Sequence, residues 1–186
     1  MREVEVKAHV DDWKALKERI DSLYGKSEDV NKSDLYFALP GEIHQALRIR
    51  NNKGVLELTT KKMSSDNLSE DNIEYEVMTD ISQEQTAIGF FECLGYEKYF
   101  RKIKSGWEWM VDSIHVELME VSGYSYRKEG KEKNVGWFLE LEILLPPSLK
   151  IDLREKQKSL YDLLSRLGIS EEEIETKSYR SMILGN

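Results

Sequence analysis

Ionisable residues occupy one face of six predicted strands, and this alternation limits the fold more than any other feature. The first segment is Glu3-Val4-Glu5-Val6-Lys7, where two carboxylates and an ammonium alternate with two valines. Successive side chains of a strand point to opposite faces, so one face is charged and the other apolar. Five later segments repeat the arrangement, with Arg48 and Arg50, Lys61, Glu74 and Glu76, Lys102 and Lys104, and Glu140 and Glu142.

The surrounding pattern predicts an α+β protein with about eight strands and three or four helices. We expect strands at 1–7, 34–39, 46–50, 55–61, 73–77, 98–110, 113–121 and 136–144. Helices are expected after an N-cap at Asp11, then at about 83–94 and 149–167, with a short one after Ser170. Polar loops are expected at 26–32, 64–72 and 122–134. Most strand connections are short, so the sheet should be mainly antiparallel.

Composition excludes several classes of protein. The chain has 186 residues and a net charge of −8, which disfavours binding to nucleic acid or to an anionic membrane. Hydrophobic residues make up 40% of the sequence, enough for a sizeable core, and we expect residues 1–186 to form one domain with C-terminal helices at 149–186.

The chain shows no long apolar run and no secretory signal, so neither a membrane span nor export is expected. The only cysteine, Cys93, lies in an apolar helical pattern and is predicted to be a buried thiol. No disulfide can form within the chain, which fits a cytoplasmic location.

The charged faces allow two interpretations. In the first, they are ordinary solvent-facing surfaces of a sheet whose other face forms the core. In the second, the apolar faces pack outward against helices, and the charged faces line a closed eight-stranded barrel. Repeated Glu-x-Glu and like charges along single strands favour the second interpretation, because uncompensated like charges destabilise a sheet. Such an interior requires both an anion and divalent cations, which a polyphosphate with Mg²⁺ or Mn²⁺ would supply.

The order of these segments resembles the CYTH domains, also called triphosphate tunnel metalloenzymes. Glu3-x-Glu5-x-Lys7 is similar to the N-terminal signature of that family, and Ala46-Leu47-Arg48-Ile49-Arg50 is similar to its A-L-R-x-R strand. Further matches are Asp34-Leu35-Tyr36-Phe37, Leu58-Thr59-Thr60-Lys61, Glu74-x-Glu76, Lys102-x-Lys104-x-x-Trp107, Ile114-His115-Val116-Glu117 and Phe138-Leu139-Glu140-Leu141-Glu142. The tail Lys177-Ser178-Tyr179 resembles the class IV adenylate cyclase branch.

The resemblance implies a role for each charged group. Phosphate binding falls to Lys7, Arg48, Arg50, Lys61, Lys102 and Lys104, and binding of Mg²⁺ or Mn²⁺ to Glu3, Glu5, Glu76, Glu117, Glu140 and Glu142. The catalytic residues it implies are Glu5, Lys7, Glu117 and Glu140. His115 is expected to lie away from Glu117 and is not counted as a ligand. Tyr179 is expected either over the tunnel mouth or in a helix end packed on the barrel.

Three departures from the family pattern bear on the substrate. Lys104 stands where the family has arginine and lacks the bidentate fork. Glu117 stands where it has aspartate and is one methylene longer. The loop before the last acidic strand, from Ser122 to Val135, is predicted to be longer than is usual in the family.

The resemblance implies a metal-dependent enzyme that acts on a small triphosphate, either ATP or tripolyphosphate. Our first prediction is a class IV adenylate cyclase that converts ATP to cyclic AMP and pyrophosphate. The alternatives are a triphosphatase, acting on tripolyphosphate, thiamine triphosphate or nucleoside triphosphates, and a noncatalytic polyphosphate-binding module. Members of this family are often dimers, so a homodimer is an expectation that no segment of the sequence locates.

Overall fold

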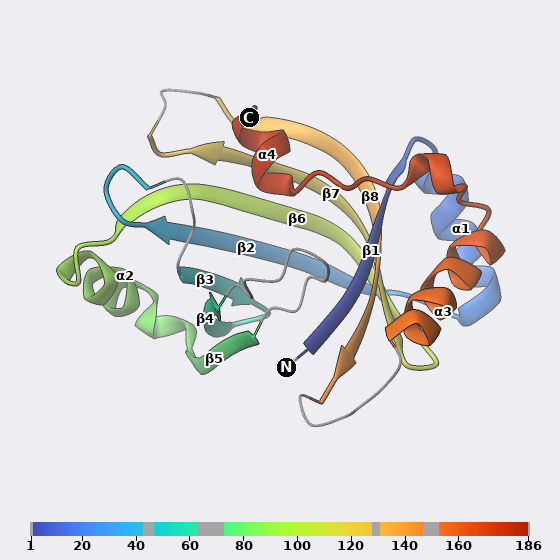
Figure 1. Cartoon of the computed structure of the whole chain (residues 1–186), viewed down its shortest axis with the longest axis horizontal. Coiled ribbons are helices and arrows are strands. Elements are labelled where there is room, and N and C mark those ends of the chain that lie inside the picture. The colour runs from blue at the N-terminus through green and yellow to red at the C-terminus, as the bar shows by residue number, and fades with distance from the viewer. Residues whose placement is uncertain (1, 43–46, 63–72, 128–130, 147–152, 186) are drawn as a thin grey trace.

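A computed structural model describes residues 2–42, 47–62, 73–127, 131–146 and 153–185 (Figure 1). Eight strands are present, as predicted: β1 Arg2–Val10, β2 Glu28–Ala38, β3 Leu47–Asn52, β4 Val55–Lys62, β5 Ile73–Asp80, β6 Glu97–Val111, β7 Ile114–Ser125 and β8 Lys133–Leu145. The helices are α1 Trp13–Tyr24, α2 Glu84–Cys93, α3 Leu153–Arg166 and α4 Tyr179–Leu184, with single 3₁₀ turns at Ile81–Gln83 and Glu171–Glu173. The α+β class is confirmed.

The eight strands form one antiparallel sheet in the order β1-β8-β7-β6-β2-β3-β4-β5. Strands β1 and β5 are its two edges, and they do not pair with each other within the described ranges. The predicted closure into a barrel is therefore not confirmed, although the strand number and the antiparallel arrangement are.

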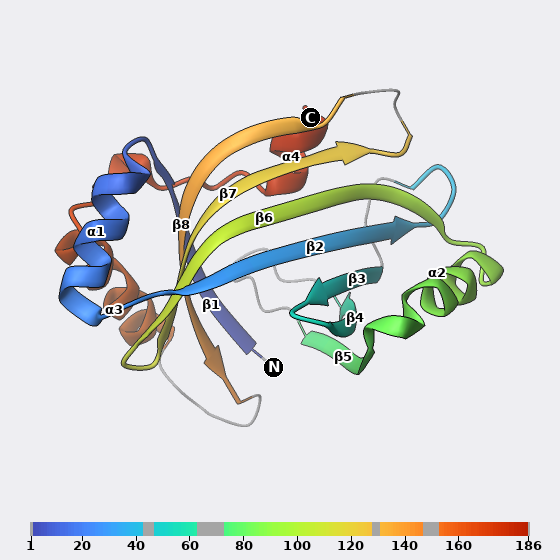
Figure 2. The ribbon, with the colours of Figure 1, turned by 180° about the vertical axis from the view of Figure 1, so that it is seen from behind.

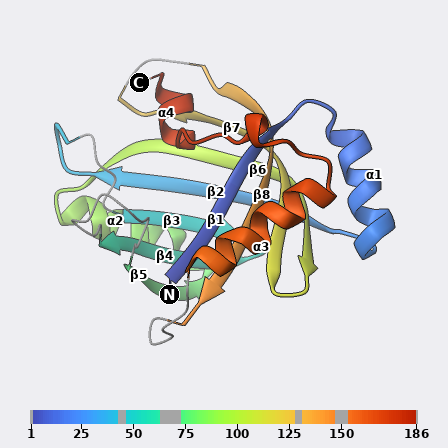
Figure 3. The ribbon, with the colours of Figure 1, turned by 45° about the vertical axis from the view of Figure 1, so that its right-hand side comes forward.

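The sheet is strongly curved, and its concave face carries the charges. Figure 2 shows β6, β7 and β8 bending together, and Figure 3 shows β1 crossing at a steep angle in front of β2 and β3. Ion pairs join strands that are not neighbours in the sheet. Lys104 of β6 contacts Glu140 of β8, and Lys32 of β2 contacts Glu117 of β7. Such contacts across an intervening strand require a sheet that curls toward these side chains.

The opposite, convex face is apolar and is covered by helices. Leu16 and Ile20 of α1 and Leu160 and Leu163 of α3 pack against β1, β8, β7 and β6. On the other half of the sheet, α2 packs Ala87, Ile88 and Phe91 against β2, β3 and β4. Burial of each large apolar side chain contributes roughly 1.5–3 kcal/mol. This core explains why the charged residues face the other way, which both interpretations of the sequence predict.

The C-terminal segment lies on the concave face, unlike the other helices. Tyr179 and Ile183 of α4 pack against Val30, Phe138 and other apolar residues of β2, β7 and β8 that share the charged face. Before α4, Ile174 forms a bridge with Ala8 of β1, and the backbone N–H of Glu175 donates to the carbonyl oxygen of Lys7 at 2.8 Å. The free edge of β1 is thus partly covered by the chain's own tail.

Several local predictions are corrected by the structure. The side chain that caps α1 is Asp12, which accepts from the N–H of Ala15 at 3.1 Å, and not Asp11. Strand β2 begins at Glu28, within the predicted loop 26–32. Strands β7 and β8 extend into the predicted loop 122–134, so the connection between them is shorter than the sequence suggested. Cys93 is exposed, not buried.

The predicted loop 64–72 lies outside the described residues. Among the described helices, none is long and apolar enough to cross a membrane.

Candidate active site on the concave face

The register of the strands brings most of the predicted charged residues together. Lys7 of β1 lies opposite Glu140 of β8, which lies opposite Glu117 of β7. In the other part of the sheet, Lys102 of β6 lies opposite Asp34 of β2, which lies opposite Arg50 of β3. We call these regions the acidic half and the cationic half. The acidic half holds Glu3, Glu5, Glu117, Glu140 and Glu142 with Lys7 and Lys104, and the cationic half holds Arg48, Arg50 and Lys102.

Asp34 organises the cationic half. Its carboxylate is almost fully buried and accepts from Arg50 through Nε at 2.7 Å and Nη2 at 2.9 Å. The Nζ of Lys102 lies 3.0 Å from Asp34 Oδ2, and the Tyr36 hydroxyl donates to the same oxygen at 3.2 Å. Burial alone would raise the pKa of Asp34, but the charges of Lys102 and Arg50 outweigh it and hold this pKa well below 3.8. Asp34 is therefore an anion that fixes two cations.

Arg48 completes the cationic half. Its Nη2 donates to Thr59 Oγ1 at 2.9 Å and lies 3.7 Å from Glu76 Oε1, while its buried Nε has no partner among the described residues. Glu76 was predicted with the metal-binding carboxylates, but the structure places it beside Arg48 on edge strand β5, apart from the acidic half. Lys61 lies in β4, and its side chain is outside the described part of the structure.

Lys104 is the buried cation of the acidic half. Its Nζ lies 2.5 Å from Glu140 Oε2 and 3.4 Å from Glu117 Oε2, and its side chain is only 7% exposed. Burial lowers the pKa of Lys104, but the charges of Glu140 and Glu117 outweigh burial and raise it above its usual value. The same pairing, with Lys32 as a second cation, lowers the pKa of Glu117 to about 2 against the effect of burial. Both groups are therefore charged at neutral pH.

The carboxylates of Glu5 and Glu140 can still bind a cation. Glu140 Oε1 is buried and has no hydrogen-bond partner among the described residues. Part of the Glu5 side chain is exposed to solvent, but protein atoms surround its carboxylate closely. This burial, and then the charge of Glu140, raise the pKa of Glu5 to about 7. Burial also lowers the pKa of the neighbouring Lys7, against the charges of Glu5 and Glu140. Excess negative charge is thus concentrated around Glu5 and Glu140.

The prediction for His115 is wrong. Residues 115 and 117 are two positions apart on β7, so alternation places them on the same face, and both lie on the concave face. His115 Nε2 is 3.1 Å from Glu108 Oε2, and Nδ1 is 3.9 Å from Glu117 Oε1 and 3.8 Å from Glu142 Oε2. Glu142 does most to raise the pKa of His115, and Glu117 and Glu108 act in the same direction, while burial opposes them.

Sequence reasoning missed four charged groups on this face, and assigned Asp34 no role. Lys32, Glu108 and Glu57 were not assigned to it, and His115 was assigned to the other side. Glu108 has the same strand parity as Lys104, Glu57 as Lys61, and His115 as Glu117, so the alternation contained the signal for these three. Lys32 has the parity of Asp34 but precedes the strand that the sequence predicted. Arg101, by contrast, has the opposite parity to Lys102 and donates to Ser33 on the convex face.

Tyr179 lies on the proposed phosphate-binding lysines. Its ring centroid is 4.3 Å from Lys7 Nζ, 5.4 Å from Lys104 Nζ and 5.5 Å from Lys102 Nζ. The Lys7 ammonium also donates to the carbonyl oxygen of Lys177 at 2.5 Å. Of the two positions expected for Tyr179, the structure shows the one over the site: the side chain is buried on the charged face.

The residues present fit a hard divalent cation at the acidic half. Mg²⁺ and Mn²⁺ prefer carboxylate oxygens, and Glu5, Glu140 and Glu142 lie on adjacent strands, with Glu5 opposite Glu142. The buried, unpartnered Glu140 Oε1 is the observation that supports the fit. A second set, Glu108, His115 and Glu117, offers three ligand atoms within 4.8 Å of one another.

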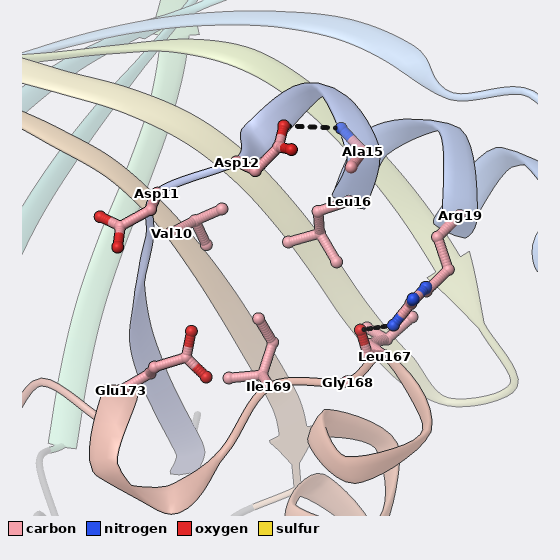
Figure 4. Close-up of a pocket in the computed structure, with 10 residues that line it drawn as sticks. All are labelled: Val10, Asp11, Asp12, Ala15, Leu16, Arg19, Leu167, Gly168, Ile169 and Glu173. Atoms are coloured by element: carbon pink, nitrogen blue, oxygen red, sulfur yellow. Dashed lines mark hydrogen bonds between the residues drawn. The ribbon is translucent and has the colours of Figure 1, made fainter.

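A pocket on the other side of the molecule is not part of this site. It lies between the end of β1, α1 and residues 167–173, as Figure 4 shows. Two of its polar groups have structural roles: Asp12 caps α1, and Arg19 Nη1 donates to the carbonyl oxygen of Leu167 at 2.9 Å. The charge and geometry needed for anion and metal binding are on the concave face instead.

Comparison with known proteins identifies the family. Residues 1–179 match the CYTH domain. A protein of Methanocaldococcus jannaschii named putative adenylate cyclase is 30% identical over 192 residues, covering 96% of this chain and 97% of its own. The solved structure of the PH1012 protein of Pyrococcus horikoshii has a TM-score of 0.70 and 26% identity, covering 97% of this chain and 99% of that chain. A structure of a putative adenylate cyclase from Vibrio parahaemolyticus has a TM-score of 0.73 at 20% identity, covering 100% and 99%, and supports the fold.

The chain therefore belongs to the CYTH domain family, as the order of its motifs predicted.

Proposed function

We propose that this chain is a metal-dependent enzyme that binds a triphosphate on the concave face and cyclises ATP to cyclic AMP and pyrophosphate. The observation that carries the proposal is the adjacency of buried cations and carboxylates on one face, with Lys104 in contact with both acidic partners. A metal-bound polyphosphate satisfies both halves at once. The name of the 30% identical relative supports the choice of cyclase.

Phosphate binding falls to the cationic half and to the two lysines of the acidic half. Arg50 has Nε and Nη2 engaged by Asp34, so it offers the phosphate mainly Nη1, which lies 3.9 Å from Glu57 Oε2. The unpartnered Nε of Arg48 is a second donor. Lysines 7, 102 and 104 act as point charges beside Tyr179. The roles proposed for Lys61 in phosphate binding and for Glu76 in metal binding rest on the sequence pattern alone.

The divalent cation, Mg²⁺ or Mn²⁺, would be held by Glu5, Glu140 and Glu142, with Glu3 and Glu117 beside them. When bound, it neutralises phosphate charge and strengthens the electrophilic character of phosphorus. Lys104 orients the Glu140 carboxylate through the 2.5 Å contact. Because Lys104 holds Glu140 and Glu117, and Lys32 also holds Glu117, these two carboxylates need little rearrangement when ligand binds.

Cyclisation needs the ribose 3′-hydroxyl to lose its proton, and a divalent cation held by Glu5 and Glu140 would lower the pKa of that hydroxyl. The 3′-oxygen forms a bond to the α-phosphorus as its proton passes to solvent. The bond from the α-phosphorus to the bridging oxygen breaks, and pyrophosphate leaves with the electron pair. The basic residues Lys7 and Lys104 lie where they can stabilise that charge.

Hydrolysis of a triphosphate is the second candidate, and the position of Tyr179 favours it. The ring lies on three proposed phosphate-binding lysines, and with Phe138 and Ile183 it fills one end of the concave face. A short inorganic chain needs less of this space than a nucleotide does. Water would then attack the terminal phosphorus, using the same cations.

Product identification separates the candidates. The protein is incubated with Mn²⁺ or Mg²⁺ and either ATP or tripolyphosphate. We expect cyclic AMP and pyrophosphate from ATP. Orthophosphate from tripolyphosphate with no cyclic product would contradict the cyclase proposal and support hydrolysis. Saturable binding of tripolyphosphate with no product from either compound would identify a binding module. A Glu5→Gln variant is the matched control, because it should bind phosphate but form no product.

A further inference from the structure

Lys32 is a buried cation that has no role in the phosphate site. It lies on β2, two residues before Asp34 and on the same face, and its side chain is 10% exposed. Its ammonium donates to Glu117 Oε1 and lies 3.9 Å from Glu108 Oε2. A buried lysine remains charged only when nearby anions compensate its lost hydration. Glu117 and Glu108 are the anions that lie next to Lys32.

The partners of Lys32 are themselves composed like a metal site. Glu108, His115 and Glu117 offer two carboxylate oxygens and one imidazole nitrogen within 4.8 Å of one another. Two carboxylates and a histidine form a typical ligand set for Mn²⁺, Co²⁺ or Zn²⁺. Each member is already engaged, however. Glu117 pairs with Lys32 and Lys104, and His115 Nε2 contacts Glu108 at 3.1 Å.

The acidic half differs from this cluster in one respect. Around Glu5 and Glu140, a buried carboxylate oxygen, Glu140 Oε1, has no partner among the described residues. Around Glu117 and Glu108, the Lys32 ammonium supplies the positive charge. Glu140 thus has a buried oxygen left for a cation although Lys104 contacts its other oxygen, whereas the Lys32 ammonium already lies near both Glu117 and Glu108.

We propose that the Lys32 ammonium takes the place of a second metal ion, so that the site binds a single divalent cation, at Glu5 and Glu140. The Glu108–His115–Glu117 cluster is then a latent metal site that Lys32 blocks by occupying the space between its carboxylates and by charge repulsion. Lys32 is a positioning residue: it holds Glu117 without touching substrate. This inference rests on the proposed function, since it counts the metal ions of that same site.

The inference is tested by counting Co²⁺ ions bound per chain in equilibrium dialysis, on the full chain without nucleotide. Co²⁺ also has a visible absorption spectrum that reports a nitrogen ligand. We expect Lys32→Ala to bind one more Co²⁺ than the wild type. The added ion should be lost in the double variant Lys32→Ala/His115→Ala. Lys53→Ala is the matched control, because Lys53 also contacts Glu108, at 3.0 Å, but is half exposed, so its removal should add no ion.

A second measurement does not depend on the folding of Lys32→Ala. In the wild-type background, His115→Ala should change neither the Co²⁺ count nor the spectrum, because the latent site is closed. Loss of an ion in His115→Ala would overturn the inference, as would two ions on the wild type or no added ion on a folded Lys32→Ala. If the wild type binds no Co²⁺, the metal site of the proposed function is contradicted. The comparison with Lys32→Ala would still show whether Lys32 keeps a metal ion out of the Glu108–His115–Glu117 cluster.

Discussion

At the scale of single residues, Asp34 determines how the cationic half is held together. It receives two hydrogen bonds from Arg50 and an ion pair from Lys102 in a position with almost no solvent access. Replacing it by asparagine leaves two buried cations without their anion. Removal of one partner from a buried ion pair costs about 3–5 kcal/mol. The Asp34 carboxylate is therefore a structural requirement of the site, although the sequence offered only its motif position.

We predict that Asp34→Asn lowers the free energy of unfolding by about 3 kcal/mol at pH 7. Added tripolyphosphate should restore part of the loss, because a bound anion supplies the missing negative charge. Urea unfolding with and without tripolyphosphate measures both effects. Asp29→Asn on the same strand is the control, since Asp29 is exposed. Equal stability of Asp34→Asn and wild type would contradict the assignment.

The same carboxylate predicts a pH dependence. The pKa of Asp34 is held well below 3.8 in the folded protein, so its stabilising contribution is complete above the unfolded-state pKa near 3.8. The contribution is lost as pH falls toward the folded-state pKa. The stability gap between wild type and Asp34→Asn should therefore narrow as pH is lowered from about 5 to about 2. Urea midpoints at four pH values would measure it, and a gap that is constant over this range would refute the prediction.

At the scale of elements, the sequence predicted all eight strands but not all of their boundaries. Alternation identified β1, β3 and β8 because apolar and charged residues separate cleanly there. Strand β2 was predicted six residues too short at its N-terminal end, because Glu28-Asp29-Val30-Asn31-Lys32 is polar on both faces and lacks the usual signal. That error is why Lys32 was missed. His115 was missed for a different reason: the alternation rule was applied wrongly to a strand that had been predicted correctly.

The position of α4 could not be predicted from the sequence. A six-residue helix carries too little periodicity to show which surface it covers, and its partners Val30, Phe138 and Val121 come from three strands. They form an apolar patch at one end of a charged face, which is a property of the assembled sheet. The structure thus places over the charged site an aromatic ring for which the sequence left two positions open.

We predict that the ring of Tyr179, and not its hydroxyl, anchors α4. The hydroxyl is buried and makes no hydrogen bond of regular geometry among the described residues. Burial, and then the charge of Glu140 and a contact with its side chain, raise the pKa of Tyr179. Tyr179→Phe should therefore be as stable as wild type, within about 1 kcal/mol. Tyr179→Ala loses the ring over three lysines and should cost about 2 kcal/mol or more. Urea unfolding distinguishes them, and a Phe variant as unstable as the Ala variant would reveal an essential hydroxyl contact.

At the scale of the whole molecule, the cations and carboxylates of the concave face compensate one another in the ligand-free chain. Lys104 is shared by Glu140 and Glu117, and Arg50 and Lys102 are held by Asp34. Metal or triphosphate alone must compete with these internal ion pairs. When a metal binds the carboxylates, their lysines are released to phosphate, and a bound phosphate releases carboxylates to metal. The two ligands should therefore bind with positive coupling.

This coupling gives a prediction for thermal stability. Mn²⁺ and tripolyphosphate added together should raise the melting temperature by more than the sum of their separate effects. A coupling free energy of about 1 kcal/mol corresponds to an excess of roughly 2–4 °C for a chain of this size. Mn²⁺ and tripolyphosphate also form a complex with each other in solution. An Arg48→Ala variant controls for that complex, because it is measured in the same mixture but lacks one phosphate donor. Strictly additive shifts in the wild type would show that the two halves of the concave face act independently.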